Sequence, residues 1–225
     1  MTPPDPIESY ALLADLRTAA LVGLDGSIDW LCLPRFDSSC CFARILGDDS
    51  SGHWRIGPSG VVSEVRRRYR GDSLVLETEF DTPEGTVRLI DFMTPEAADT
   101  DDAPEVVRIV EGVRGTVEVE MSWVVRLAYG HAVPWVRRVG GGILAVAGPE
   151  AVLLRGDVLP ERVYGERAHR GRVVVHAGER YTWTMQWVSR TDRLPPPLSP
   201  VDAVAATERF WTHWSSQIRY DGPHA

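Results

Sequence analysis

The sequence predicts a mostly β protein: a large antiparallel β-sandwich, or super-sandwich, of about a dozen or more strands, followed by a C-terminal linker helix. Short runs in which apolar and polar residues alternate cover most of the chain. Turn residues, mainly Gly and Pro, separate these runs at hairpin spacing. Helical spacing begins only after residue 200. Two stacked sheets account for this pattern, and a barrel is the weaker alternative.

The first predicted hairpin lies in RTAALVGLDGSIDWLCLPRFDSS, residues 17–39. TAALVG and SIDWLCL are its strands. Asp25-Gly26 lies between them and is expected to supply the positive φ angles of a tight turn.

A half-buried strand is clearest in TVEVEMSWVVRL, residues 116–127. One face of this run is apolar, and the other carries most of the polar residues, as in an antiparallel sheet that covers a core. Turns that reverse the chain are predicted at TPEGT (82–86), VRGT (113–116), VGGGI (139–143), AGPE (147–150) and HAGER (176–180).

The composition changes at RLPPPLSP, so we divide the chain into a β-sandwich domain (1–192), a Pro-rich linker (193–200) and a linker helix (201–218). Ser199 is the expected N-cap, with Pro200 and Asp202 in the first turn. An apolar stripe follows at helical spacing, formed by Val204, Trp211, Trp214 and Ile218. The sandwich must cover it, or else a downstream domain, which we expect because the chain stops without a closing element.

The charge balance limits the class of partner. The formal net charge is −8, from 32 acidic and 24 basic residues, and every basic residue is Arg. We therefore expect neither nucleic acid nor a membrane as partner, and RRRYR (66–70) is read as a solvated strand face. No run approaches the length of a membrane span, and no signal peptide is visible. Three cysteines without metal-site spacing are most simply explained by a reducing cytoplasm.

No motif for chemistry is complete in this chain. There is no phosphate-binding loop and no nucleophile turn, and the six His residues are scattered, so we predict no cofactor and no metal site. A glycosidase needs two carboxyl groups about 5–10 Å apart. Asp29, Asp37 and Asp91 are the carboxylates with large apolar or aromatic neighbours. For Asp29 we favour a structural role, in which it accepts hydrogen bonds that order the hairpin.

The loop LPRFDSS, residues 33–39, has two readings. Pro34 ends the strand, and Asp37 with Ser38 could cap a short helix near SCCFARIL, while Arg35 pairs locally. Alternatively, the loop presents Arg35 to a partner domain or to a sugar hydroxyl. Our candidates for a domain interface or pocket rim are Asp29, Trp30, Arg35, Phe36 and Asp37.

Several segments resemble the start of bacterial glycoside hydrolase family 15 proteins, the glucoamylase and trehalase-like group. They are PIESYALLADLRTAALVGLDGSIDWLCLPRFDSS, YRGDSLVLETEF, VRLIDFM, VVRIVEGVRG, YGHAVPW and ERFWTHWSSQIRYDGP, and in order they cover nearly the whole chain. One departure is Ser39-Cys40-Cys41, where the family often has a proline after FDS.

The resemblance implies a noncatalytic sandwich joined by its linker and helix to an (α/α)₆ barrel. Two glutamates of that barrel would hydrolyse an α-glucosidic bond with inversion, and their motifs lie beyond this chain. We therefore expect no catalytic residue here, with the chain's own C-terminal barrel as its partner and an α-glucoside as substrate of the parent enzyme. Trp211 and Trp214 would face the barrel, and the chain alone would self-associate. The alternatives are a free-standing carbohydrate-binding sandwich and a self-contained enzyme.

Overall fold

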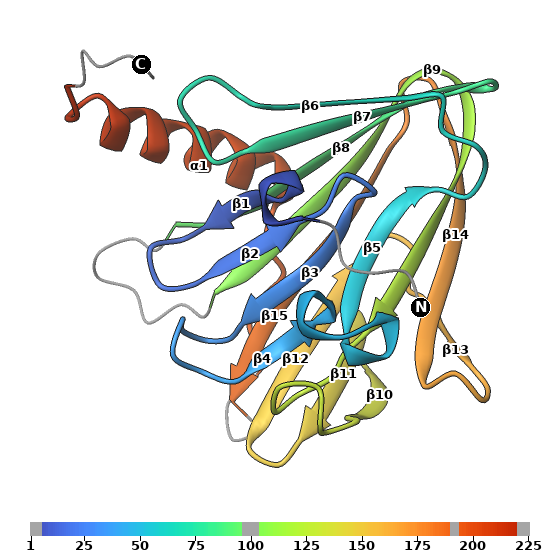
Figure 1. Cartoon of the computed structure of the whole chain (residues 1–225), viewed down its shortest axis with the longest axis vertical. Helices are drawn as coiled ribbons and strands as arrows, with labels where there is room; N and C mark the ends of the chain where they lie inside the picture. The colour runs from blue at the N-terminus through green and yellow to red at the C-terminus, as the bar shows by residue number, and fades with distance from the viewer. Residues whose placement is uncertain (1–5, 96–103, 190–193, 220–225) are drawn as a thin grey trace.

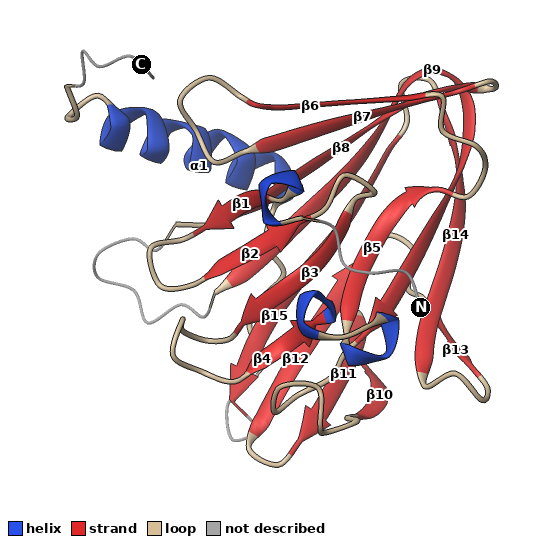
Figure 2. Cartoon of the chain, viewed as in Figure 1, coloured by secondary structure: helices blue, strands red, loops and turns tan. Residues whose placement is uncertain are grey.

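A computed structural model describes residues 6–95, 104–189 and 194–219, and it confirms the mostly β fold. Fifteen strands of the described residues join into one antiparallel hydrogen-bonded network, and a single α-helix, α1 (Pro200–Ser215), follows them (Figures 1 and 2). The network folds into two layers, which are the two sheets of the predicted sandwich.

The first sheet contains the N-terminal strands and one later hairpin. Its members are β1 (Ala11–Ala14), β2 (Ala19–Val22), β3 (Ser27–Cys32), β4 (Cys40–Ala43), β5 (His53–Pro58), β13 (Glu161–Val163) and β14 (Ala168–His176). Short 3₁₀ turns accompany it: η1 (Ile7–Ser9), η2 (Arg44–Leu46) and η3 (Asp49–Ser51). In the β2–β3 hairpin only Gly26 takes a positive φ (76°), so one residue supplies the turn geometry that we expected from the Asp25-Gly26 pair.

The second sheet contains β6 (Glu64–Tyr69), β7 (Leu76–Thr82), β8 (Gly85–Met93), β10 (Trp135–Val139), β11 (Gly142–Ala147), β12 (Glu150–Gly156) and β15 (Arg180–Ser189). The remaining strand, β9 (Glu105–Val124), belongs to both sheets. Its first half pairs with β8 and β15, and its second half pairs with β5 and β14.

The turn predicted at 113–116 is wrong, because these residues lie inside β9 and the chain bends there without reversing. Two glycines make the bend possible. A Cβ at Gly112 would collide with the carbonyl oxygen of His176, and a Cβ at Gly115 would collide with that of Glu84. Gly115 also has a φ of 68°, which other residues rarely adopt. Neighbouring strands therefore approach β9 closely at the point where it passes from one sheet to the other.

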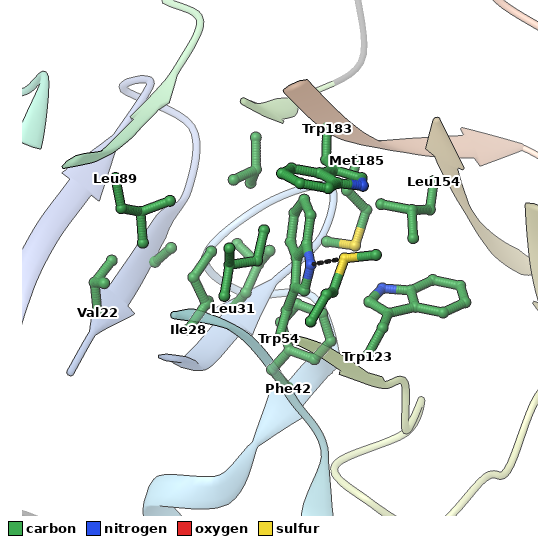
Figure 3. Close-up of a cluster of buried hydrophobic side chains, with 14 of the residues drawn as sticks. Val22, Ile28, Leu31, Phe42, Trp54, Leu89, Trp123, Leu154, Trp183 and Met185 are labelled. Carbon is green, nitrogen blue, oxygen red and sulfur yellow. Dashed lines mark hydrogen bonds between the residues drawn. The ribbon is translucent and has the colours of Figure 1, made fainter. Parts of the chain in front are cut away.

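The main core lies between the sheets and contains the apolar face predicted for residues 116–127. Three tryptophans, Trp54, Trp123 and Trp183, are among its largest buried side chains (Figure 3). The Trp54 indole donates to the sulfur of Met121 at 3.3 Å, and the Trp183 indole donates to the carbonyl of Val158 at 2.6 Å.

A buried ion pair lies inside this core. Arg108 on β9 donates to both carboxylate oxygens of Asp91 on β8, at 2.8 and 3.1 Å. The same guanidinium reaches the first sheet, where it donates to the backbone carbonyls of Trp54 and Gly26. Arg108 therefore connects the two layers by hydrogen bonds as well as by packing.

Helix α1 covers part of the outer face of the second sheet. Ala203, with half-buried Val204 and Leu198, packs against an apolar cluster formed by Val75, Ile90, Phe92, Val107 and Ile109. Arg70, beyond the end of β6, pairs with Glu208 of the helix at 3.0 Å. Ser199 lies at the N-cap but makes no side-chain cap bond, and the helix ends at Ser215. Ile218 therefore lies beyond the helix.

Candidate functional site: the loop edge

Two neighbouring connections form the candidate site, which we call the loop edge: the β1–β2 turn (residues 15–18) and the β3–β4 loop (residues 33–39). Both lie on the left of Figure 1. The backbone N–H of Phe36 donates to the carbonyl of Arg17 at 3.0 Å, so the two connections are joined directly. The edge places exposed Leu16 and Phe36 beside an Arg–Asp pair.

The tip of the β3–β4 loop is open to solvent. Arg35 donates to both oxygens of Asp37, at 2.9 and 3.0 Å, and the two side chains are 68% and 71% exposed. The bond from Arg35 lowers the pKa of the Asp37 carboxyl. Phe36, between them, is 63% exposed. These three predicted residues do lie together, and nothing in the described chain covers them.

The base of the same loop is fixed by contacts from distant segments. The hydroxyl of Tyr129 donates to the carbonyl of Ser38 at 3.3 Å, and Ser39 donates to the Glu150 carboxylate at 2.6 Å. The short helix expected near residues 39–46 is wrong: Cys40–Ala43 form strand β4, and only Arg44–Leu46 turn as a 3₁₀ helix. All four residues of β4 are buried. The strand pairs with β3 on one side, and on the other Cys41 accepts from the backbone N–H of Arg126 while the N–H of Ala43 donates to Gly52.

The β1–β2 turn contributes a residue that our sequence analysis missed. Leu16 adopts a positive φ of 76° and is 55% exposed. Its conformation is held by Asp15, whose carboxylate accepts from the backbone N–H groups of Arg17 and Thr18 at 2.9 and 2.8 Å. Burial raises the pKa of Asp15, although these bonds oppose the rise. An Asp that can accept hydrogen bonds from the backbone two and three residues later, just before a strand, is a turn signal that could have been read from ADLRT.

Asp29 is not on the rim. It is 2% exposed and has no direct partner on β2, because the register passes from Trp30–Leu21 to Ile28–Val22. Its carboxylate accepts from the hydroxyls of Ser27 (2.5 Å) and Tyr10 (2.9 Å) and from the Arg44 guanidinium (3.1 Å). The carboxylate is thus enclosed by donors, the arrangement that a role in ordering the hairpin requires.

Trp30 is half-buried and packs on a small cluster with Cys32, Cys40 and Ala43. All three cysteines are buried and unpaired with one another. Burial raises the pKa of Cys40 to about 11 and also raises that of Cys41. These thiols are therefore poor nucleophiles, because a thiol reacts as its thiolate.

The two candidate helix residues lie in different surroundings. Trp211 is 5% exposed, on the same buried face as Ala203 and Thr207. Trp214 is 45% exposed, and its ring meets that of Trp211 edge to face at 5.7 Å between centroids. Two residues of the predicted stripe present large apolar area to solvent: Trp214 on the helix, and Ile218 beyond its end.

The buried Asp carboxylates of the described chain have structural partners. Asp29 binds Arg44, Asp91 binds Arg108, and Asp15 accepts from its own turn. Within residues 6–95, 104–189 and 194–219, no three His, Cys, Asp or Glu side chains group as a metal site would. No described helix is long and apolar enough to cross a membrane. What the loop edge presents to solvent is thus two apolar side chains and one exposed ion pair.

Comparison with known proteins identifies the family. Residues 2–185 match the family described as "Trehalase-like, N-terminal". The chain belongs to this trehalase-like N-terminal family. It is 39% identical to a trehalase of Mycobacterium tuberculosis over 134 residues, 52% of this chain and 19% of that protein. It is 26% identical to a trehalase of Thermoplasma volcanium over 221 residues, 97% of this chain and 35% of that protein. The trehalase-like domain thus spans about a third or less of these relatives.

A solved structure shows a similar fold for the trehalase-like domain. A putative kojibiose phosphorylase from the human microbiome superposes with a TM-score of 0.50 at 10% identity. The alignment covers 96% of this chain and 37% of the other. At this identity the likeness concerns the fold alone.

Proposed function

We propose that this chain is the noncatalytic N-terminal sandwich of an α-glucoside hydrolase of the trehalase or glucoamylase type, and that it braces the catalytic part of that enzyme. The observation that carries the proposal is the difference in coverage. The alignment with the Thermoplasma volcanium trehalase includes 97% of this chain but only 35% of the relative. The remaining two thirds of such a protein has room for a catalytic barrel.

The carboxylates support a noncatalytic role. Inverting hydrolysis needs one carboxyl group as acid and another as base, with space for a water molecule between them. Burial raises the pKa of Asp91, as a general acid requires, but both its oxygens are bound by Arg108 inside the core. Asp37 is fully open to solvent and is held ionised by Arg35. Neither residue has the setting of a catalytic acid.

The loop edge and the exposed end of α1 support the bracing role. Both carry large apolar side chains in solvent: Leu16 and Phe36 on the edge, and Trp214 on the helix. Apolar burial contributes about 25 cal/mol per Å², so a barrel seated on these side chains would gain stability by covering them. Arg35 and Asp37 would then lie at the interface and could extend to the rim of the glucose pocket.

Two assays on the purified chain test this proposal. We expect no release of glucose from trehalose or maltooligosaccharides, because the acid and base lie elsewhere in the parent enzyme. We also expect sedimentation to show self-association that Trp214→Ala reduces, with Ala206→Ser, at another exposed helix position, as the matched control. Glucose release by the chain, or a monomer at all concentrations, would contradict the proposal.

A second candidate function is a carbohydrate-binding module, favoured by two exposed aromatic rings. Trp135 is 84% exposed and Tyr164 is 89% exposed, and such rings stack on sugar faces. Titration with glucose, trehalose and maltooligosaccharides, followed by tryptophan fluorescence, separates the candidates. Saturable quenching that Trp135→Ala abolishes would favour the binding module, and an unchanged spectrum would favour the brace.

A further inference from the structure

A pocket of about 120 Å³ is lined by residues at the end of β9, in the β13–β14 hairpin and in the segment that leads into β10. Its volume is roughly that of four water molecules in the liquid. The β13–β14 hairpin and β10 lie at the lower right of Figure 1. Among the residues that the structure describes, no carboxylate lines the pocket. Its polar lining is cationic or donates hydrogen bonds, and comes from Trp123, Arg126, Trp135, Arg162, Arg167 and His169.

Arg126 is the buried cation of the pocket, at 6% exposure. Within the described part of the chain, its guanidinium donates to no carboxylate and to two backbone carbonyls, those of Val125 at 2.8 Å and Arg167 at 3.1 Å. Burial, and then the positive charge of Arg167, lower its pKa. A buried charge without a counter-charge is unfavourable, so an anion in this pocket would relieve a cost that the fold bears.

Arg162 and Arg167 add two more cations at the same place. In the described residues, no Asp or Glu lies within 4 Å of the guanidinium groups of Arg126, Arg162 or Arg167, whereas Arg170 and Arg172 on β14 are paired with Glu166 and Glu120. Burial and then Arg162 lower the pKa of His169, which also lines the pocket. The positive charge is therefore concentrated on one side of β14 and neutralised on the other.

One buried donor beside the pocket has no hydrogen-bond partner in the described residues. The Trp123 side chain is completely buried, lines the pocket, and has no hydrogen-bond partner for its indole N–H. The indoles of Trp54 and Trp183 in the same core each have an acceptor, and Figure 3 draws the bond from Trp54. Buried donors are nearly always paired. The indoles of Trp187 and Trp211 are likewise without a partner in the described residues, so the Trp123 N–H adds an unsatisfied donor beside the pocket and does not by itself identify a ligand.

We propose that this pocket binds a tetrahedral oxyanion of the phosphate class, either free or carried on a sugar. Guanidinium groups bind phosphate oxygens through paired, charge-assisted bonds, and three arginines line this pocket. Trp135 stands at the mouth with most of its ring exposed, so a sugar attached to the anion could stack on it. This site is separate from the loop edge and does not depend on the proposed bracing role.

Calorimetric titration of the 225-residue chain tests the proposal, with inorganic phosphate, glucose 6-phosphate and glucose as probes at constant ionic strength set with sodium chloride. We expect saturable binding of one phosphate group per chain and no binding of glucose. Arg162→Gln and Arg167→Gln together should weaken it about tenfold or more, because each removes charge-assisted bonds. Both positions are exposed, so the variants should fold, and circular dichroism checks this.

Arg170→Gln and Arg172→Gln, on the same hairpin but paired with glutamates, form the matched control and should bind phosphate as the unmodified chain does. Tighter binding of glucose 6-phosphate than of phosphate, reversed by Trp135→Ala, would identify a sugar phosphate as the ligand. Equal affinities would identify the free anion. Absence of phosphate binding, or equal weakening by the control pair, would overturn the proposal.

Discussion

The interior of the sandwich and its loop edge use the same pair of residue types in opposite surroundings. Asp91 and Arg108 lie 2.8 Å apart at 1% and 0% exposure, and Arg35 and Asp37 lie 2.9 Å apart at 68% and 71%. The interior pair also bonds to two carbonyls of the other sheet, whereas the guanidinium of the edge pair bonds only to Asp37. The distance between two charged groups therefore does not by itself show whether their pairing holds the fold together.

The difference separates the ion pair that the fold requires from the ion pair whose side chains are free to contact a partner. A buried pair must stay intact, because either partner alone would be an uncompensated charge in the core. An exposed pair contributes little to stability, because water screens it, so its side chains can exchange their mutual contact for contact with a partner. The interior maintains the fold, and the edge is available for binding.

Loss of the interior pair should have the largest effect. We expect Arg108→Leu to lower the free energy of unfolding by about 3–5 kcal/mol, because Asp91 would remain buried without a counter-charge. Urea denaturation measures this. The double variant with Asp91→Leu should be more stable than the single one, because no unpaired charge remains. If Arg108→Leu unfolded at the normal urea concentration, the interior pair would have no special role.

The two tryptophans of α1 repeat the comparison within one element. Trp211→Ala should cost about 3 kcal/mol, because it leaves a cavity under the helix. Trp214→Ala should cost much less, about 1 kcal/mol or below, because nearly half of that side chain is already in solvent. Thermal unfolding of both variants measures the difference. Equal destabilisation would show that the helix has no distinct inner and outer tryptophan.

Asp29 tests whether the hairpin carboxylate belongs to the interior. We expect Asp29→Ala to cost about 2 kcal/mol, because Arg44 loses a buried partner and the hydroxyls of Ser27 and Tyr10 lose their acceptor. Asp49→Ala is the control, since Asp49 also binds Arg44 but is exposed. Chemical denaturation that ranks Asp49→Ala as the more harmful change would place Asp29 with the edge.

Removal of the edge pair should have almost no effect on the chain. We expect Arg35→Ala with Asp37→Ala to leave the melting temperature within replicate scatter, because both side chains are open to solvent. In a longer protein that includes the barrel, the same change should lower the melting temperature or the turnover of α-glucosides. If the change lowered the melting temperature of both proteins equally, the edge pair would have only a structural role within the sandwich.

The smallest expected effect is on the acid titration of Asp37. Arg35 lowers the pKa of Asp37, so the pair favours the folded state above the unfolded pKa of Asp, about 3.9, and this contribution is lost as the pH falls through the folded pKa. Arg35→Gln should raise the Asp37 pKa toward its ordinary value. Carboxyl carbon NMR shifts across an acid titration report the change, and an unaltered titration would mean that the two side chains do not pair in solution.

Sequence periodicity predicted the two-sheet fold because alternation records which side of each strand is buried. It failed at residues 113–116, since Val-Arg-Gly-Thr has the composition of a turn and only the neighbouring strands show that β9 continues. It identified Arg35, Phe36 and Asp37 as neighbours, because they are adjacent in the chain. It could not foresee that Asp29 would be enclosed by Tyr10 and Arg44, or that Arg126, Arg162 and Arg167 would converge, because these residues meet only through the tertiary fold.

One strand, β9, runs through both sheets, so neither sheet is complete without the strand that also belongs to the other. Each half of β9 is an interior strand of its sheet, with a hydrogen-bonded strand on both sides. Loss of β9 would therefore remove backbone hydrogen bonds from both sheets. The domain should consequently melt in a single step. At Gly112 and Gly115, where neighbouring backbone lies too close for a side chain, the two layers are therefore joined covalently as well as by packing.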